Sequence, residues 1–386
     1  KNAIVIFDQL FQKSLQDHGI LFQDSQSYIT PQRMVFKASI APFSATVSEE
    51  RRGPKVSAPD QAIQGFLKSV DLTSKDQLTV KDDYYFATLT QPAKDAKALL
   101  PSILEDVFHK MSWPKVMRYP GASLPWVRPV RHVICSFDGQ ALVFDLPYLG
   151  LTTAQTTMGH RFLSKEKINI STFAAYEADL KANSVILCHQ ERQKFIIDTL
   201  NDCASQYNLR LNVDQALLDE VTGLAEMPMI YMRPIPDKFM GLDESILVTS
   251  MTLHQKYFTF YDQDHKIAPY FALATNNKPH DAEVMLKGFE NVLKARLSDA
   301  VFFFETDMKT PLGNFLDKLK TVLFQDKLGS MFDKVQRLLN LAQDVEEKQI
   351  IQLAKCDLVT AMVGEFPELQ GRMGHLYAIS QGMDAQ

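Results

Sequence analysis

Residues 284–304 read VMLKGFENVLKARLSDAVFFF, and this stretch decides how the C-terminal part of the chain folds. Its apolar residues recur at intervals of three and four, which places them on one face of a helix of about five turns. These residues are Leu286, Phe289, Leu293, Leu297, Val301 and Phe304. We expect that face to be buried, with Glu290 paired to Lys294 and Arg296 paired to Asp299 along the charged flank.

The length and composition are those of a globular protein with more than one domain. The chain has 386 residues, of which 46% are hydrophobic and 23% are charged. The longest apolar runs, such as AVFFF at 300–304, fall far short of the roughly 20 residues that a membrane span needs. The opening KNAIVIFDQLF lacks the features of a secretory signal and begins without Met, so we expect the true start to be missing.

The cysteine spacing and the absence of common motifs argue against several classes of metal site and enzyme. Cys135, Cys188, Cys203 and Cys356 lie far apart with no CxxC pair, which argues against a zinc site and a disulfide framework. We therefore expect a reducing, cytoplasmic setting. The motifs for phosphate loops, dinucleotide binding, zincins and α/β-hydrolases (GxxxxGKS or GxxxxGKT, GxGxxG, HExxH and GxSxG) are absent, so none of these chemistries has support in the sequence.

Positive charge gathers between Asp106 and Asp138, where no acidic residue occurs. The net charge of −5 is uninformative about nucleic acid, because binding depends on whether positive charge collects on one face. The basic residues in this gap are Lys110, Lys115, Arg118, Arg128 and Arg131. An acid-free gap of this length is expected about once by chance in such a chain, so the gap alone does not establish a binding surface.

The remaining patterns predict an α+β fold in which helices and strands alternate at short intervals. Residues 51–55, RRGPK, are expected to form a tight basic loop, and QLTVKDDYYFATLT at 77–90 a hairpin with Asp82 and Asp83 at its turn. A second hairpin is expected around Asp138 and Gly139. Strands are also expected at 185–188, 256–261 and 267–275, and a helix at 244–253. No strand signal remains after residue 279, which predicts an all-helical end.

Nine short segments, taken in order along the chain, resemble one protein family. They are TPQRM (30–34), RGP (52–54), MRY (117–119), WVRPVRH (126–132), GHRF (159–162), LLDEVTGLAEMP (217–228), HQKYF (254–258), VLKARLSDAVFFFETD (292–307) and VGEFPELQG (363–371). Each is weak alone, but the ordered set resembles the β subunit of bacterial heterotetrameric glycyl-tRNA synthetase. The chain departs from the family pattern at Tyr119, Met227 and Phe289.

The resemblance implies a division of labour. In this family the α subunit carries the class II active site that makes glycyl-adenylate, and the β subunit supplies much of the tRNA recognition. The chain is then expected to bind no cofactor itself, with ATP and Mg²⁺ bound at the α subunit. Its expected partners are tRNA-Gly and the α subunit in an α2β2 complex, with no membrane and no DNA. The family β subunit is longer at both ends, so we expect a fragment that alone does not activate glycine.

The length and the change of pattern near residue 278 predict three domains, and the resemblance implies a set of tRNA-binding candidates. The expected domains are residues 1–150 (α+β, with basic loops), 151–278 (a second α+β domain) and 279–386 (helical, leading into a truncated HD-like domain). Arginine presents a planar fork of donors that suits phosphate oxygens, and basic loops can also stack on bases. The candidates are Arg51, Arg52, Lys55, Arg118, Arg128, Arg131, His160, Arg161, His254, Lys256, Lys294 and Arg296. The same side chains also suit pairing within the chain or contact with the α subunit, and a lone loop histidine such as His160 is more often structural.

The resemblance to an HD-type domain raises the question of whether Cys356 and Asp357 bind a metal ion. The metal site of such a domain in related proteins uses adjacent His and Asp, whereas here Cys356 stands at the presumed His position before Asp357. Asp357 follows Ile350 and Leu353 on a helical face and is expected to be partly buried. A thiol beside a carboxylate is a poor site for a hard divalent cation, so we expect no bound metal and no catalytic residue in this chain.

Three functional hypotheses remain open on the sequence alone. The first is a non-catalytic subunit of glycine–tRNA ligase that binds tRNA and assembles with the α subunit. The second is an enzyme, either an HD-type metal phosphohydrolase or a hydrolytic editing domain, although glycine is small enough that a synthetase pocket can exclude other amino acids by size. The third is a scaffold that docks the α subunit without touching RNA, which basic loops serve equally well.

Overall fold

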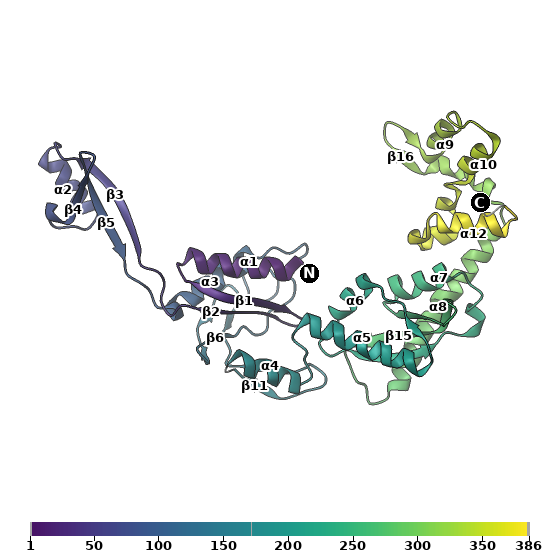
Figure 1. The fold of residues 1–386 in the computed structure, drawn as a ribbon, viewed down its shortest axis with the longest axis horizontal. Coiled ribbons are helices and arrows are strands. Elements are labelled where there is room, and N and C mark those ends of the chain that lie inside the picture. The colour runs from purple at the N-terminus through teal and green to yellow at the C-terminus, as the bar shows by residue number, and fades with distance from the viewer. Residues whose placement is uncertain (1, 171, 384–386) are drawn as a thin grey trace. The chain divides into compact units, whose positions relative to one another are not determined.

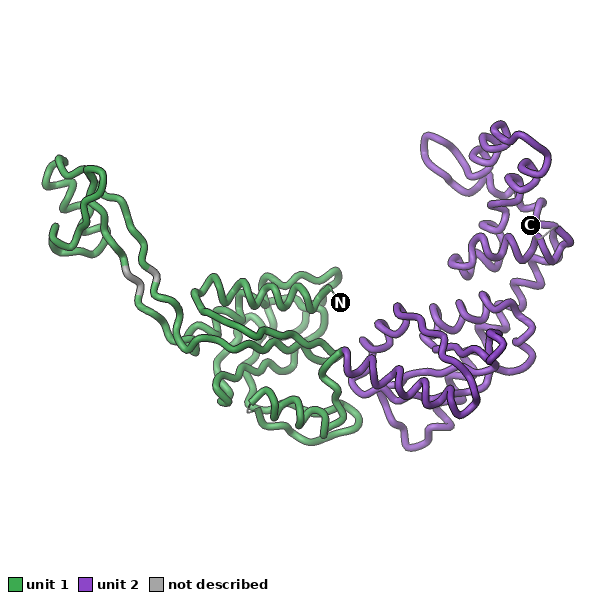
Figure 2. Tube along the Cα trace, viewed as in Figure 1, with its two compact units in different colours: residues 1–189 green, residues 190–386 purple. Residues whose placement is uncertain are grey.

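The computed structural model describes residues 2–170 and 172–383, which divide into two compact units, residues 1–189 and 190–386 (Figure 2). Helices and strands alternate in both units (Figure 1), which confirms the α+β class. The division into three domains at residues 150 and 278 stays a prediction.

The body of unit 1 is built on two helices and a hairpin. α1 (Asn2–Asp17) packs against α3 (Ala96–Lys110) and against the antiparallel pair β1 (Phe22–Ile29) and β2 (Met34–Ile40). The turn between the strands closes because the Thr30 hydroxyl accepts hydrogen bonds from the backbone N–H groups of Gln32 and Arg33. Leu15, Ile103 and Leu146 are buried together in the core, so apolar burial holds this body together.

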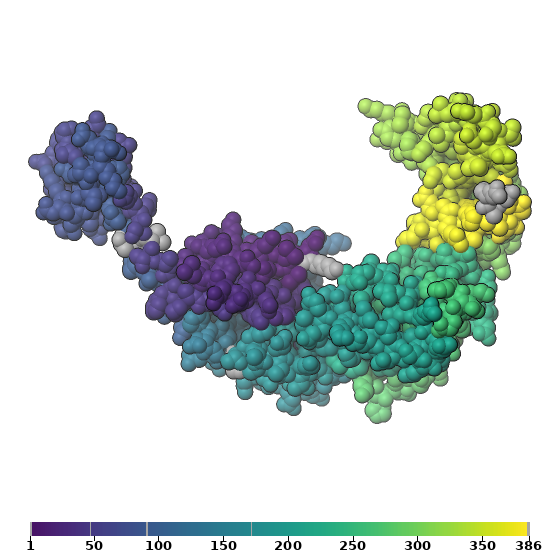
Figure 3. Space-filling model, in the orientation of Figure 1, coloured from purple at the N-terminus to yellow at the C-terminus, as the bar shows by residue number. Residues whose placement is uncertain are grey.

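Residues 47–91 form what we call the sheet subdomain, of which residues 48–89 are shown in blue in the space-filling view (Figure 3). Its antiparallel sheet has the order β3-β5-β4, with β3 at Val47–Lys55, β4 at Leu78–Lys81 and β5 at Tyr84–Gln91. The connection carries α2 (Asp60–Ser69) and the 3-10 turn η1 (Lys75–Gln77). The predicted hairpin at 77–90 is confirmed: Asp82 and Asp83 have φ of 48° and 65°, as a two-residue hairpin turn requires.

The prediction of a tight loop at residues 51–55 was wrong. Arg51 and Arg52 lie in β3, opposite Ala87 and Phe86 of β5, and the register shifts between Arg52 and Lys55. Gly53 and Pro54 therefore make a bulge within the strand. Glycine is required there because a Cβ on residue 53 would overlap the ring of Phe66 on α2.

The rest of unit 1 is made of short paired strands and one helix. The strands are β6 (Cys135–Phe137), β7 (Gln140–Leu142), β8 (Asp145–Leu146), β9 (Leu151–Thr152), β10 (Thr156–Met158) and β11 (Lys167–Asn169), and the helix is α4 (Phe173–Ala182). The hairpin at Asp138 and Gly139 is confirmed, with φ of 49° and 73°. The strand predicted at 185–188 was wrong: this segment is irregular, because Val185 and Leu187 are buried against Ile168 and Leu180 as core residues of a loop.

Unit 2 is built on a four-stranded antiparallel sheet with the order β12-β14-β15-β13. The strands are β12 (Arg210–Leu211), β13 (Met229–Pro234), β14 (Phe258–Tyr261) and β15 (Ile267–Thr275), which confirms the strands predicted near 256–261 and 267–275. One face packs on α5 (His189–Gln206) and α6 (Gln215–Thr222). The other face packs on the short turn η2 (Asp237–Phe239), on α7 (Glu244–Thr249) with the π-helical turn η3 (Ser250–His254), and on α8. The alternation along β15, with Phe271 on one side and Ala272 on the other, follows from these two layers.

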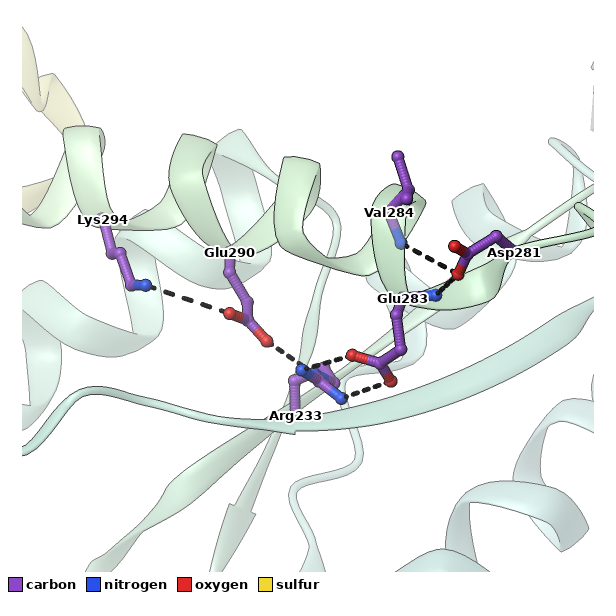
Figure 4. Close-up of polar contacts among 6 residues, drawn as sticks. All are labelled: Arg233, Asp281, Glu283, Val284, Glu290 and Lys294. Carbon is purple, nitrogen blue, oxygen red and sulfur yellow. Dashed lines mark hydrogen bonds and ion pairs between the residues drawn. The ribbon is translucent and has the colours of Figure 1, made fainter.

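The predicted central helix is confirmed as α8 (Ala282–Met308), the longest helix of the described residues. Asp281 caps it by accepting from Glu283 N at 2.9 Å and Val284 N at 3.4 Å (Figure 4). Leu286, Leu293 and Leu297 are buried, and the other three predicted face residues are half-buried. Of residues 2–170 and 172–383, no helix is both long and apolar enough to cross a membrane.

The two charge pairs predicted on α8 have different outcomes. Lys294 Nζ lies 3.9 Å from Glu290, as expected for positions four apart (Figure 4). The pairing of Arg296 with Asp299 was wrong, because Arg296 instead donates to Glu365 at 2.8 Å. Glu365 belongs to another helix, which spacing within α8 cannot reveal.

The C-terminal part of unit 2 follows α8 and is mostly helical. Its helices and turns are η4 (Leu312–Thr321), α9 (Met331–Leu339), α10 (Val345–Leu353), η5 (Cys356–Val359), α11 (Ala361–Glu365), η6 (Pro367–Leu369) and α12 (Arg372–Ser380). The all-helical prediction was wrong in one place, where β16 (Leu323–Gln325) pairs with β17 (Gly329–Ser330). The pair is too short to show a period in sequence, and it depends on Gly329 adopting φ of 81°. An HD-like domain is not confirmed by this arrangement.

Candidate nucleic-acid interface

Residues 111–134, between α3 and β6, form what we call the basic loop, which is irregular but firmly anchored. Met117 N donates to Trp126 O at 2.8 Å, and Trp126 N donates to Met117 O at 3.2 Å. The buried Trp126 ring packs 5.2 Å from the ring of Trp113 and 5.1 Å from that of Phe108. This bridge fixes the backbone next to Arg118 and Arg128.

A second set of contacts holds the remainder of the basic loop. The carbonyl of Tyr148 accepts hydrogen bonds from Ser123 N at 3.1 Å and Leu124 N at 3.0 Å. Val130 N donates to the phenol oxygen of Tyr119 at 3.4 Å. A Cβ on residue 150 would overlap the carbonyl group of Gly121, so only glycine allows this close approach. The loop backbone is therefore held in place on both sides of its arginines.

The basic loop exposes its cations to solvent. Lys115, Arg118, Arg128 and Arg131 are all exposed. Within residues 2–170 and 172–383, no carboxylate lies within ion-pair distance of any of the four. The sequence prediction of an irregular basic loop is confirmed for Lys115, Arg118, Arg128 and Arg131. Lys110, which the acid-free gap also contains, instead ends α3 and pairs with Asp106 at 3.2 Å. Exposed guanidinium groups without a carboxylate partner, on a backbone that is held in place, suit phosphate oxygens of an external ligand.

The sheet subdomain carries three further candidates on β3. Arg51, Arg52 and Lys55 are exposed, and no ion pair to a described carboxylate forms at any of them. The Arg52 guanidinium lies 3.6 Å above the centre of the Tyr84 ring, and Lys55 Nζ lies 5.6 Å from the same ring. The sequence did not single out Tyr84, although its place directly after the Asp82–Asp83 turn could have indicated it.

His160 and Arg161 are neighbours with opposite environments. The His160 ring is fully buried, and its Nδ1 accepts hydrogen bonds from Phe162 N at 3.2 Å and Leu163 N at 3.3 Å. Arg33 donates to the carbonyls of Met158 and Gly159, which ties this turn to the hairpin of β1 and β2. His160 therefore organises the GHRF turn, and Arg161 is the exposed member of the pair, with its guanidinium 5.4 Å from the Phe162 ring.

All four candidates in unit 2 face carboxylates of their own unit. Lys256 Nζ lies 2.9 Å from Glu220, Arg296 Nη1 lies 2.8 Å from Glu365, and Lys294 pairs with Glu290 as described above. Each of these three side chains is half-buried. His254 Nε2 lies 3.8 Å from Glu368, and its ring packs edge-on against Phe366 at 5.1 Å. Lys256, Lys294 and Arg296 are thus paired with carboxylates within the fold, and His254 lies beside one.

Glu290 also pairs with Arg233, which bridges two glutamates of α8. Arg233 of β13 donates from Nε to Glu290 at 2.6 Å and from both terminal nitrogens to Glu283, at 3.1 and 3.2 Å (Figure 4). Hydrogen bonding to Glu290 raises the pKa of the Arg233 guanidinium. Arg233 was not among the residues singled out from sequence, because its partners lie about fifty residues further along the chain.

Cys356 and Asp357 do not fit a site for a divalent metal. Burial, with the neighbouring Asp357 charge, raises the pKa of the Cys356 thiol to about 11, and the thiol donates to Gln352 O at 3.1 Å. A neutral thiol is not a ligand for a hard cation. Asp357 accepts from Gly371 N at 2.5 Å, and in the part of the chain that the structure describes, His, Cys, Asp and Glu side chains form no group of three able to hold a metal.

The expected setting of Asp357 needs a correction. Asp357 is 1% exposed, so burial is confirmed and is more complete than expected. The helical face shared with Ile350 and Leu353 was wrong, since α10 ends at Leu353, Ile350 is exposed and Asp357 lies in η5. The buried carboxylate that organises this region is Asp307, which accepts from Ala361 N, Met362 N and the phenol of Tyr377 at 2.7 to 2.9 Å. Asp307 closes the quoted segment at 292–307, and sequence gave it no role.

Comparisons with known proteins agree with the motifs. The family model described as glycyl-tRNA synthetase beta subunit matches residues 1–386. The chain is similar to the glycine–tRNA ligase beta subunit of Rickettsia prowazekii (37% identity, 98% of this chain and 58% of the relative), of Rickettsia typhi (36%, 100% and 59%) and of Phenylobacterium zucineum (37%, 98% and 59%). The chain thus spans less than two thirds of the length of these relatives. Since the match runs along the whole chain, the chain belongs to the glycyl-tRNA synthetase β subunit family.

Proposed function

We propose that this chain binds tRNA through the basic loop and so supports the ATP-dependent glycylation of tRNA-Gly by a separate catalytic α subunit. The observation that carries tRNA binding is the basic loop itself, whose backbone is held in place and whose cations are exposed and without described carboxylate partners. The names of the family and of its relatives support the link to glycylation. In this proposal the chain works in the cytoplasm, in an α2β2 complex.

The chemistry of the basic loop fits an RNA backbone. Each arginine can give two parallel N–H donors to one phosphate, and neutralising a phosphate releases condensed counterions. Because the loop backbone is anchored by Trp126 and by the Tyr148 carbonyl, little backbone entropy is lost when its arginines bind. Glycine activation, ATP and Mg²⁺ belong to the α subunit in this proposal, and the chain's own residues position the tRNA.

The test is binding of the chain to tRNA-Gly and to an unrelated tRNA across a salt series. The loop variant is Arg128→Ala/Arg131→Ala, and the matched control is Lys256→Ala/Arg296→Ala, which also removes two cations but takes them from paired positions. We expect the loop variant to reduce the slope of log affinity against log salt by about 1 to 2, since each lost phosphate contact removes roughly 0.7 to 0.9. The control should leave the slope unchanged.

The outcomes separate the remaining hypotheses. If both variants bind like the parent chain, the basic loop is not a tRNA surface. If the loop variant keeps tRNA binding but fails to restore glycylation when mixed with the α subunit, the loop docks protein and the scaffold hypothesis replaces this one. A preference for tRNA-Gly over the unrelated tRNA would assign identity reading to this chain.

A further inference from the structure

We propose that the outer face of the sheet subdomain binds an unpaired base of an RNA, stacked on the outward side of the Arg52 guanidinium. The outer face is defined here as the side of the β3-β5-β4 sheet that carries Arg52, Tyr84, Phe86 and Lys81. This inference rests on the proposed function to the extent that the chain contacts RNA. It adds a second site, with a different chemistry from that of the basic loop.

The register of the sheet separates the outer face from the face that α2 covers. Ala87 is fully buried, and Phe66 of α2 packs against Gly53, so these positions belong to the covered side. Alternate residues of a strand point to opposite sides. Tyr84 and Phe86 flank Tyr85 and precede Ala87, so they lie on the outer side, together with their cross-strand partners Arg52, Lys55, Thr79 and Lys81.

The outer face is half-apolar and positively charged. Tyr84 and Phe86 are only half-buried, whereas Arg52, Lys55 and Lys81 are exposed. Lys81 pairs with Glu50 at 2.6 Å and passes over Phe86 at 5.9 Å. The remaining two cations, Arg52 and Lys55, both lie over Tyr84 without a carboxylate among the described residues. Their charge is complementary to a phosphate backbone. The Arg52 guanidinium, lying over the Tyr84 ring, offers a flat surface on which a base can stack.

The geometry of the Arg52–Tyr84 pair indicates a base as the ligand. At 3.6 Å from the ring centre the guanidinium lies in stacking contact with Tyr84, and a planar guanidinium is itself a surface on which bases stack. Lys55 lies close enough to meet the adjoining phosphate. Bases in a duplex already stack on one another, so only an unpaired nucleotide in a loop or at an end can use this platform. An acidic peptide would use the charges but not the planar stack.

The test uses the chain and a single-stranded RNA hexamer that carries the fluorescent base 2-aminopurine, whose emission falls on stacking. The deciding variant is Arg52→Lys, which keeps the charge and removes the plane, and Tyr84→Leu removes the ring beneath it. The matched control is Arg51→Lys, on the neighbouring exposed position that faces the covered side. Thermal unfolding of each variant confirms that the sheet subdomain is folded, and Tyr84→Phe, which keeps the ring, should behave like the parent chain.

We expect Arg52→Lys and Tyr84→Leu to weaken hexamer binding roughly 5- to 100-fold, the range for loss of one stacked base. The salt slope should stay the same for Arg52→Lys, because the number of charges is unchanged. Equal binding by Arg52→Lys and the parent chain, or an equal loss in Arg51→Lys, would overturn the inference. An Asp/Glu-rich peptide whose binding falls as much in Arg52→Lys as that of the hexamer would also overturn it, because the loss would then not depend on a stacked base.

Failure of the stacking site can be distinguished from failure of tRNA binding by the basic loop. Arg128→Ala/Arg131→Ala leaves the sheet subdomain untouched, so it should leave the quenching of 2-aminopurine in the bound hexamer unchanged, even where the lost charges lower the overall affinity. If that variant has normal tRNA affinity while Arg52→Lys loses the hexamer, the basic loop proposal fails and the stacking site stands. If Arg52→Lys keeps the hexamer while the loop variant loses tRNA, the stacking site fails and the loop proposal stands.

Discussion

Arg128 in unit 1 and Arg296 in unit 2 are arginines of two segments that carry the same family resemblance, yet their surroundings differ. Arg128 is exposed and meets no carboxylate of the described residues, whereas Arg296 is half-buried and donates to Glu365 at 2.8 Å. The same contrast holds for the basic loop as a whole against Lys256 and Lys294. A cation already paired within its own fold has less to gain from an external phosphate.

A basic residue in a segment that resembles the family can therefore either pair with a carboxylate of its own fold or stay exposed for an external ligand. At the paired positions of unit 2, charges join separate elements, as where Glu290 of α8 accepts a hydrogen bond from Arg233 of β13. In unit 1 apolar contacts hold the basic loop, through Trp126 and its neighbours, and leave the charges to solvent.

Charge reversal in the basic loop should have the largest effect. We expect Arg128→Glu/Arg131→Glu to lower tRNA affinity by at least about 100-fold near 0.1 M salt, because two phosphate contacts are replaced by repulsion. The free energy of unfolding should change by less than about 0.5 kcal/mol, since neither side chain has a described carboxylate partner to lose. Fluorescence anisotropy and urea unfolding measure the two quantities. A large loss of stability would show that these arginines support the fold.

Removing Arg233 should lower the stability of the fold and leave tRNA binding unchanged. Arg233→Ala leaves the Glu290 carboxylate, whose side chain is 16% exposed, with Lys294 alone at 3.9 Å. We expect the free energy of unfolding to fall by about 1 to 3 kcal/mol, the cost of a half-buried charge that loses its main partner. The tRNA salt slope should not change. Lys294→Ala is the control, and an equal loss of stability in that variant would contradict the central place given to Arg233.

The buried Tyr377–Asp307 contact predicts a pH dependence of stability. Burial, followed by the hydrogen bond to Asp307, raises the pKa of Tyr377 well above its usual value. The unfolded phenol ionises near pH 10 while the folded one stays neutral, so its contribution is complete below about pH 10 and is lost as the pH rises further. Tyr377→Phe should cost about 1 to 2 kcal/mol at pH 8, because one donor to a buried carboxylate is removed.

Urea unfolding of the parent chain and Tyr377→Phe between pH 8 and pH 11 measures this effect. Above about pH 10 the difference between them should shrink by up to roughly 1.4 kcal/mol per pH unit, since one proton separates the two states. A difference that stays constant up to pH 11 would mean that the Tyr377 pKa is not raised. Other tyrosines titrate equally in both proteins and cancel in the comparison.

The smallest effect is expected from Arg296→Ala. Its partner Glu365 is exposed and hydrated, so loss of the pair should change the free energy of unfolding by at most about 1 kcal/mol. The tRNA affinity should stay within twofold of the parent chain. A clear loss of tRNA affinity without a loss of stability would move part of the RNA surface into unit 2.

The sequence predicted local structure well where a short period or a turn residue decided it. The helix at 284–304, the turns at Asp82–Asp83 and Asp138–Gly139, and the strand at 267–275 are all local patterns and are confirmed. The prediction of a loop at residues 51–55 failed because Gly-Pro usually marks a turn. Here residue 53 is glycine because a Cβ would overlap the Phe66 ring. The short pair β16 and β17 failed because a few residues cannot show a period.

The candidate site was predicted only in part, because pairing in space is not visible in a single sequence. Twelve tRNA-binding candidates looked alike, and what separates Arg128 from Arg296 is a carboxylate on another helix. His160 could not be placed as a buried acceptor for Phe162 N and Leu163 N before the turn was known. Tyr84 under Arg52 depends on the register of β3 against β5, which the bulge shifts.

Hydrogen exchange of the chain with and without tRNA-Gly, read by mass spectrometry, tests the contrast between the units most directly. We predict slower exchange on tRNA binding in peptides that cover the basic loop, residues 111–134, and no change in peptides that cover His254, Lys256, Lys294 and Arg296. Slower exchange confined to those unit 2 peptides, with the basic loop unchanged, would contradict the account.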